Sequence, residues 1–167
     1  GQPRVKPPFP AVVGAFGCPT VINNVETLCC ATHILLRGAD WFKAIGTDER
    51  NTGPKLYAIS GHVERPGTYE YPIGVSFQTL LDGCGGMYRG RELKAFIPGG
   101  ASAPMMKAAD REIRMDFDTL AKAGSMLGSA AVIVMDETTC MVSATLRLAE
   151  FFAHESCGQC TPCRVGT

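Results

Sequence analysis

Three cysteines near the end of the sequence are spaced so that their thiols can share one metal centre. They stand in the stretch HESCGQCTPCRVGT as Cys157, Cys160 and Cys163. Two intervening residues let consecutive thiolates converge, while Gly158 permits unusual backbone angles and Pro162 resists a continuing helix. Three clustered cysteines with one distant partner are a familiar way to hold a [4Fe–4S] cluster, whereas zinc sites use paired cysteine or histidine sets. The pattern favours an iron–sulfur cluster over a zinc site or three free thiols.

Such a site needs a fourth ligand, and the remaining residues offer no simple one. Cys140 precedes Cys157 by 17 residues, which is about 25 Å along a continuous helix at ~1.5 Å per residue. His154 has a suitable ring nitrogen, although a solvated histidine is the simpler interpretation. The other cysteines belong to other predicted elements: Cys18, Cys29, Cys30 and Cys84. We therefore expect the fourth cysteine to lie beyond Thr167.

The bulk composition describes a globular chain without a charged binding surface. It has 167 residues, 46% of them hydrophobic, and 16 basic residues balance 16 acidic ones. This balance gives no basic field for nucleic acid, and the longest apolar runs fall far short of the roughly 20 residues of a membrane span. Eight cysteines without secretory features favour metal ligation over disulfides. The sequence has no signal peptide or initiator methionine, so we expect an internal piece of a longer protein.

The first third of the chain predicts two helices. Asn23 or Asn24 can cap the first of them, and Gly38 can end it. Its apolar positions follow one helical face that we expect to be buried: Val25, Leu28, Cys29, Thr32, Leu35 and Leu36. A shorter helix is expected over residues 39–45. The polar, turn-rich residues 49–55 then mark a domain boundary.

The middle of the chain predicts a small α+β domain. Strands are expected over residues 55–63, 68–74, 93–97 and 130–135. Ser76 can cap a helix whose buried face includes Cys84, and a short helix is expected near residues 117–122. The order strand, strand, helix, strand, strand is that of a β-grasp domain, with another small α+β topology as the alternative.

The last predicted element is a long amphipathic helix that leads into the cysteine stretch. It should begin with Thr138 or Thr139 as its cap and run to about Glu155. Its apolar stripe is unusually broad: Val142, Leu146, Leu148, Ala149, Phe151 and Phe152. A stripe of this width predicts a helical bundle or a domain interface, and the partners of such a bundle are absent from these residues.

Seven segments, read in order, resemble the NADH-binding flavoprotein subunit of respiratory complex I, the F subunit of bacteria and the 51 kDa subunit of mitochondria. The segments are KPPFPA, FGCPTVINNVET, KLYAISGHV, IPGGASAP, MDFDTL, GSAAVIVMD and FFAHESCGQCTPCRVGT. The resemblance implies an α+β chain of three parts. Residues 1–50 would be the tail of an α/β domain that binds FMN and NADH. Residues 54–137 would be a soluble-ligand-binding β-grasp domain, and 138–167 the first helix of a C-terminal bundle with its cluster loop.

The resemblance also implies the cofactor contacts. The residues implied to contact FMN are Ile22, Asn23, Asn24 and Thr27. A helix start with two asparagines can offer N–H and amide donors to a phosphate and to ribityl hydroxyls. The residues implied to ligate a [4Fe–4S] cluster are Cys157, Cys160 and Cys163. The glycine-rich FMN and NAD(H) motifs would lie upstream, and the fourth cysteine downstream.

The implied activity is NADH dehydrogenase, an NADH:quinone oxidoreductase in which NADH reduces FMN and electrons pass through the cluster to partner subunits. The implied partners are other peripheral-arm subunits, including the [2Fe–2S] E-type subunit and the G-type iron–sulfur subunit. No general acid or base is expected, because hydride transfer is chemistry of the flavin. The implied location is the cytoplasmic side of the bacterial inner membrane, or the matrix side in mitochondria, without insertion. Residues 1–167 alone are expected to be inactive.

Two alternatives stay open from the sequence. The same module occurs in diaphorase subunits of NAD-dependent hydrogenases and formate dehydrogenases, and nothing within these residues separates them from complex I. A β-grasp ligand- or protein-binding module with a structural zinc knuckle is an alternative of another class. Metal content separates that alternative from the redox function, because a cluster brings iron and colour whereas zinc brings neither.

Overall fold

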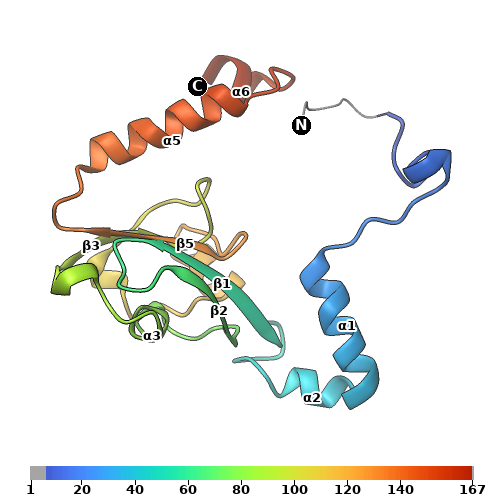
Figure 1. The fold of residues 1–167 in the computed structure, drawn as a ribbon, viewed down its shortest axis with the longest axis horizontal. Coiled ribbons are helices and arrows are strands. Elements are labelled where there is room, and N and C mark those ends of the chain that lie inside the picture. The colour runs from blue at the N-terminus through green and yellow to red at the C-terminus, as the bar shows by residue number, and fades with distance from the viewer. Residues whose placement is uncertain (1–6, 167) are drawn as a thin grey trace.

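The computed structural model describes residues 7–166, and it is an α+β fold built around one mixed sheet (Figure 1). The strands are β1 Pro54–Gly61, β2 Gly67–Pro72, β3 Leu93–Ile97, β4 Met106–Lys107 and β5 Ala131–Asp136, in the order β2-β1-β5-β3-β4. The central strand β5 runs parallel to β1 and antiparallel to β3. The predicted α+β class is confirmed, and the four predicted strands are present with slightly shifted ends. The two-residue strand β4 was not predicted, because a strand this short carries no periodic signal.

Six α-helices accompany the sheet in the described residues. They are α1 Val25–Arg37, α2 Ala39–Lys43, α3 Phe77–Gly83, α4 Phe117–Lys122, α5 Met141–Glu155 and α6 Thr161–Gly166. Short 3₁₀ turns occupy Ala15–Gly17, Tyr88–Gly90 and Ala108–Asp110. The expectation that Pro162 resists a continuing helix is consistent with the structure, because α5 ends at Glu155 and Pro162 lies in a separate helix. Pro162 is the second residue of α6, and in a first turn its missing N–H group costs nothing.

The hydrophobic core lies on the face of the sheet that α3 covers. Phe77 of α3 stacks on Phe96 of β3 with ring centroids 3.7 Å apart, and Val132 and Val134 of β5 are fully buried beside them. The predicted burial of Cys84 is confirmed. These contacts show that the middle of the chain has a core of its own, independent of its helical ends.

The two N-terminal helices form an arm whose apolar face is open in the structure. Asn24 caps α1 by accepting a hydrogen bond from the Thr27 N–H group, and Gly38 ends it with φ +89°. No residue of α1 is buried, and Leu35 is 87% exposed. The expected burial of this face, including Cys29, is therefore wrong for the described residues. An amphipathic pattern identifies the face of a helix that is suited to packing, but it does not identify what packs there. No part of residues 7–166 covers the apolar face of α1.

One acidic residue joins this arm to the sheet. The Glu26 carboxylate accepts a hydrogen bond from the Leu56 N–H group at 2.9 Å and forms an ion pair with Lys55. Burial raises the pKa of Glu26, but the bonds from Lys55 and Leu56 outweigh it and leave that pKa lowered. Because β5 pairs with β1 only from Ala58 onward, Glu26 satisfies a strand N–H group that no neighbouring strand reaches.

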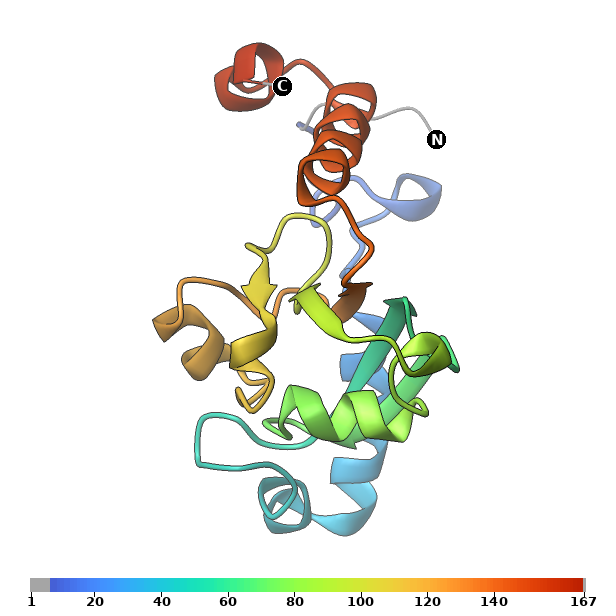
Figure 2. The same ribbon diagram turned by 90° about the vertical axis from the view of Figure 1, so that its left-hand side faces the viewer.

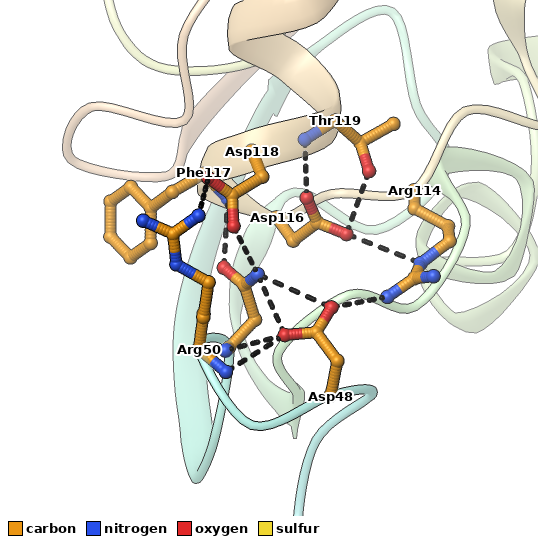
Figure 3. Close-up of polar contacts among 8 residues, drawn as sticks. Asp48, Arg50, Arg114, Asp116, Phe117, Asp118 and Thr119 are labelled. Atoms are coloured by element: carbon orange, nitrogen blue, oxygen red, sulfur yellow. Dashed lines mark hydrogen bonds and ion pairs between the residues drawn. The ribbon is translucent and has the colours of Figure 1, made fainter.

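A polar network pins the linker between the arm and the sheet onto α4 (Figure 3). Buried Asn51 donates from its amide to Asp48 and to Asp118, and its carbonyl oxygen accepts from the Phe117 N–H group at 3.2 Å. Arg114 bridges Asp48 and buried Asp116, each at 3.2 Å. Every polar atom of the Asn51 side chain therefore has a partner, which fixes the path of the chain as it enters β1.

Helix α5 lies on the opposite side of the sheet from α3, with α6 at its far end (Figures 1 and 2). One of its sides packs Met141, Ala144 and Leu148 against a second small core that includes Ile97 and Met135. The other side leaves its apolar residues open, with Val142 78%, Leu146 56% and Phe151 51% exposed. The predicted stripe therefore includes both a packed side and an unpartnered one. None of the helices in residues 7–166 combines the length and hydrophobicity needed to cross a membrane.

The predicted start of α5 is wrong by one or two residues. Cys140, and neither Thr138 nor Thr139, precedes its first residue. Both threonine hydroxyls instead hydrogen-bond to the Asp136 carboxylate, at 2.7 Å and 3.3 Å. A buried carboxylate therefore takes the hydroxyls that the capping pattern assigned to the helix.

Candidate functional site

The cysteine stretch forms a compact loop between α5 and α6. Ser156 ends α5 in an extended conformation, and Gly158 turns the chain with φ +71°. Cys157 and Cys160 are exposed, while Cys163 is half-buried in α6. The Ser156 hydroxyl lies 3.1 Å from the Cys163 sulfur and accepts a hydrogen bond from the Gly158 N–H group at 3.2 Å. The sequence predicted the three thiols but contained no sign of this hydroxyl beyond its position directly before them.

The donor chemistry of the loop fits an iron–sulfur cluster, one ligand short. All eight cysteines of the described chain are free thiols, so none of the three is used by a disulfide. Across residues 7–166, however, no three His, Cys, Asp or Glu side chains gather as a metal site. The structure thus places the three thiols on one loop without bringing their sulfur atoms together.

Neither of the two residues considered as a fourth ligand, Cys140 and His154, is directed at the cysteine loop. Cys140 stands at the opposite end of α5, a helix of 15 residues and therefore about 22 Å long. Hydrogen bonds from the Ser143 and Val142 N–H groups lower the pKa of the Cys140 thiol at that distant end. His154 is 86% exposed and pairs with Glu155 at 3.0 Å. The geometry agrees with the exclusion of Cys140 that helix length predicted.

The four residues expected to contact FMN lie along the start of α1. Ile22 and Asn23 precede the helix on an exposed extended segment, and Asn24 and Thr27 share the cap hydrogen bond of 3.2 Å. Ile22 is 72% exposed. The Thr27 N–H group is used by the cap, so in this arrangement it is not available to a ligand. This arrangement fits one wall of a ligand site, and the described residues supply no opposite wall.

An open groove lies beside this helix start, between the arm and the first two strands. It encloses about 590 Å³, and its lining includes Cys29, His33, Trp41, Leu56 and Glu70. The predicted FMN residues do not line it. Only Val25 and Cys29 of the open apolar face of α1 line the groove, so most of that face points away from it.

A buried carboxylate joins the sheet to the helix that carries the cysteine loop. The side chain of Asp136, at the end of β5, is fully buried and accepts from Arg91 at 2.8 Å. His62 lies 3.2 Å away on the other side. Lys94 extends the contact by donating to the backbone oxygen of Thr139 at 2.6 Å. The sequence did not predict this junction, because the partners of Asp136 are far apart along the chain. Its one local sign is the polar stretch MDETT, which suggests a turn.

Two family models match the chain. Residues 143–167 match the NADH-ubiquinone oxidoreductase-F iron-sulfur binding region, and residues 56–107 match the SLBB domain. The first match contains the whole cysteine loop and most of α5. The second covers most of the sheet, from β1 to β4.

Curated relatives match along the whole chain. The F 2 subunit of NADH-quinone oxidoreductase from Rhizobium meliloti (strain 1021) is 58% identical over 166 residues, which is 99% of this chain and 39% of that protein. The F subunit of the same kind of enzyme from Mycobacterium bovis is 52% identical over 167 residues, all of this chain and 37% of that protein. The chain therefore spans somewhat under two fifths of the length of these relatives.

A solved structure shares the fold. The crystal structure of an NAD⁺-reducing [NiFe]-hydrogenase in the air-oxidized state superposes with a TM-score of 0.79 at 38% identity, covering 99% of this chain and 28% of that one. The H2-reduced state gives a TM-score of 0.78. The resemblance seen in the sequence is confirmed by identity along the full chain and by both family models. The chain belongs to the F-subunit family of NADH-quinone oxidoreductases, as a segment of that longer protein.

Proposed function

We propose that this chain is the part of an NADH:quinone oxidoreductase flavoprotein subunit through which electrons leave the flavin. The cysteine loop carries this proposal, because it falls inside the segment that matches the family's iron–sulfur binding region. Identity of 52–58% with F-subunit proteins over essentially all of the chain supports the same conclusion. In the intact subunit the activity would be NADH dehydrogenase.

The chain divides into three functional parts in this proposal. Residues 1–50 are the end of the FMN- and NADH-binding domain, 54–137 a β-grasp domain of the SLBB type, and 138–167 the start of the cluster-binding helical bundle. The hairpin of β1 and β2, the covering helix α3 and the parallel pairing of β5 with β1 support the β-grasp assignment. The open side of α5 supports a bundle completed by other parts of the subunit.

Cys157, Cys160 and Cys163 would hold a [4Fe–4S] cluster, which when bound accepts and passes on single electrons. The fourth ligand would come from outside residues 1–167. The length of α5, which holds Cys140 far from the loop, and the pairing of His154 with Glu155 support this. Two exposed thiols leave room for a cluster to bind at the surface of the loop.

Ile22, Asn23, Asn24 and Thr27 would form one wall of the FMN site, and FMN when bound takes the hydride from NADH. What this chain supplies there is hydrogen bonding and shape. Asn24 holds the start of α1 through the Thr27 N–H group, and the exposed amides can face polar groups of the cofactor. The opposite wall and the NADH site would be formed by upstream residues.

The partners in this proposal are other peripheral-arm subunits, including the [2Fe–2S] E-type and the G-type iron–sulfur subunits. The assembly would lie on the cytoplasmic side of the bacterial inner membrane, or on the matrix side in mitochondria. An electron acceptor must approach closely, and an exposed cysteine loop at one extremity of the described chain suits such an approach (Figure 1).

The diaphorase of an NAD⁺-reducing hydrogenase is the second candidate, because such an enzyme shares the fold. Identity favours the first candidate, at 52–58% for the F-subunit proteins against 38% for the hydrogenase. An activity assay of the purified complex would separate the two candidates. Quinone reduction by NADH would indicate the first, and NAD⁺ reduction by hydrogen would indicate the second. A zinc knuckle would require a colourless protein with bound zinc.

The deciding experiment is metal analysis of the full-length subunit purified without oxygen. We expect about four irons, a brown colour and an electron paramagnetic resonance (EPR) signal on reduction. Cys157→Ala, Cys160→Ala and Cys163→Ala should each lose most of the iron, while the control Cys140→Ser should keep it. Zinc in place of iron, or equal iron in all variants, would contradict the proposal.

A further inference from the structure

The cysteine loop contains a short series of hydrogen bonds that includes one of its three sulfurs. The Gly158 N–H group donates to the Ser156 hydroxyl oxygen at 3.2 Å, and the same oxygen lies 3.1 Å from the Cys163 sulfur. Ser156 is half-buried, and it is fixed at the end of α5. Its position is therefore set by the helix and by the turn at Gly158, and does not depend on a mobile side chain.

The direction of this series is determined once the cysteine binds metal. With a protonated thiol, the Cys163 S–H group donates to the Ser156 oxygen. Ligation replaces the S–H bond by a metal–sulfur bond and releases the proton to solvent, so the sulfur can then only accept. The Gly158 N–H group is a donor to the hydroxyl oxygen and cannot accept the hydroxyl proton. The hydroxyl can therefore donate that proton to the sulfur of the ligated Cys163.

We propose that Ser156 is a positioning residue that donates a hydrogen bond to the sulfur of Cys163 and thereby raises the reduction potential of the cluster. This inference rests on the proposed function. Hydrogen bonds to ligand sulfurs stabilise the more negative, reduced cluster, and they are a principal means by which proteins set its potential. Charge-assisted bonds of this kind are about twice as strong as neutral ones.

The three sulfurs are not equivalent in this respect. In residues 7–166 the sulfurs of Cys157 and Cys160 accept or donate no side-chain hydrogen bond, and both residues are exposed. Cys163 is half-buried and faces the hydroxyl. The loop therefore places a hydroxyl group against the sulfur of Cys163, whereas Cys157 and Cys160 are exposed.

The test is a redox titration, monitored by EPR, of the full-length subunit within its complex. Ser156→Ala should lower the midpoint potential of the cluster with iron content unchanged, and Ser156→Thr should restore it because it keeps the hydroxyl. Thr161→Ala is the matched control, since it removes a hydroxyl from the same loop without touching this contact, and it should leave the potential unchanged. In wild type, electron–nuclear double resonance should show an exchangeable proton coupled to the cluster, which Ser156→Ala should remove.

Each result decides the matter. An unchanged potential in Ser156→Ala, or an equal shift in Thr161→Ala, would overturn the inference. If Ser156→Ala fails to assemble a cluster, the wild-type proton signal decides, and its absence would overturn the inference. A wild-type subunit with no iron would instead overturn the proposed function, which keeps the two failures distinct.

Discussion

The Arg91 guanidinium lies 2.8 Å from the fully buried carboxylate of Asp136, and this ion pair stands between the end of the central strand and the helix that leads to the cysteine loop. The hydrogen bond from Arg91, acting against burial and aided by Thr138, holds the pKa of Asp136 well below its usual range. The same pairing raises the pKa of Arg91. The junction between sheet and helix is therefore electrostatic as well as hydrophobic.

The Asp136 ion pair predicts how stability depends on pH. Because the native carboxylate holds its proton less tightly than the unfolded chain does, its contribution is complete above the ordinary aspartate pKa of about 4. The contribution is lost as the pH falls below that value towards the lowered pKa. Asp136→Asn should lower the melting temperature near neutral pH and flatten the acid limb in thermal denaturation. The exposed control Asp40→Asn should do neither, and an unaltered acid limb in Asp136→Asn would contradict the assignment.

Asn51 predicts a destabilisation without any change of charge. Asn51→Leu should leave the Phe117 N–H group and the carboxylates of Asp48 and Asp118 without their amide partner. An unsatisfied buried polar group costs roughly 1–3 kcal/mol, and we expect a loss in that range in chemical denaturation. Arg50→Ala is the control, because the 83% exposed Arg50 side chain lies 3.9 Å from Asp118 and such pairs contribute about 0–1 kcal/mol. Equal losses in both would contradict the role of Asn51.

The sequence predicted the sheet and the cysteine loop well for local reasons. Alternating and apolar runs mark strands, and cysteine spacing is a property of neighbouring residues, so both can be read without knowing the fold. Even the length argument that excludes Cys140 needs only the rise of a helix. The ligand role of the cysteines stays a prediction from their spacing and from the resemblance, and the FMN contacts stay a prediction from the resemblance alone.

Contacts between distant residues could not be predicted in this way. Glu26 reads as a first-turn acid that suits the helix dipole, yet its partners are Lys55 and Leu56 in the sheet. Thr139 reads as a helix cap, yet it bonds to Asp136. In each case the side chain suits a role in its own helix but forms its hydrogen bonds with the sheet instead. The local sequence pattern does not show which of these partners the side chain will have.

Gly61 predicts a strong steric effect inside the sheet. It has φ +90°, and an added Cβ would lie 2.1 Å from the Val134 oxygen on the central strand. Gly61→Ala should therefore cost clearly more than the roughly 1–2 kcal/mol of a left-handed backbone alone. Gly124→Ala is the matched control, because Gly124 has φ +79° with no atom within 4 Å of an added Cβ. Denaturation midpoints compare the two, and similar losses would show that backbone strain alone determines the effect.

Residues 1–167 in isolation are predicted to lack NADH oxidation. They supply one wall of the proposed FMN site and three of the proposed cluster ligands, while α1 and α5 each leave an apolar face open. With added FMN, this piece should reduce ferricyanide with NADH no faster than free FMN does. The full-length subunit under the same conditions is the positive control. A substantial rate from the piece, or a stable four-iron cluster in it without an added thiol, would show that both sites are complete within these residues and would refute the proposed outside ligand.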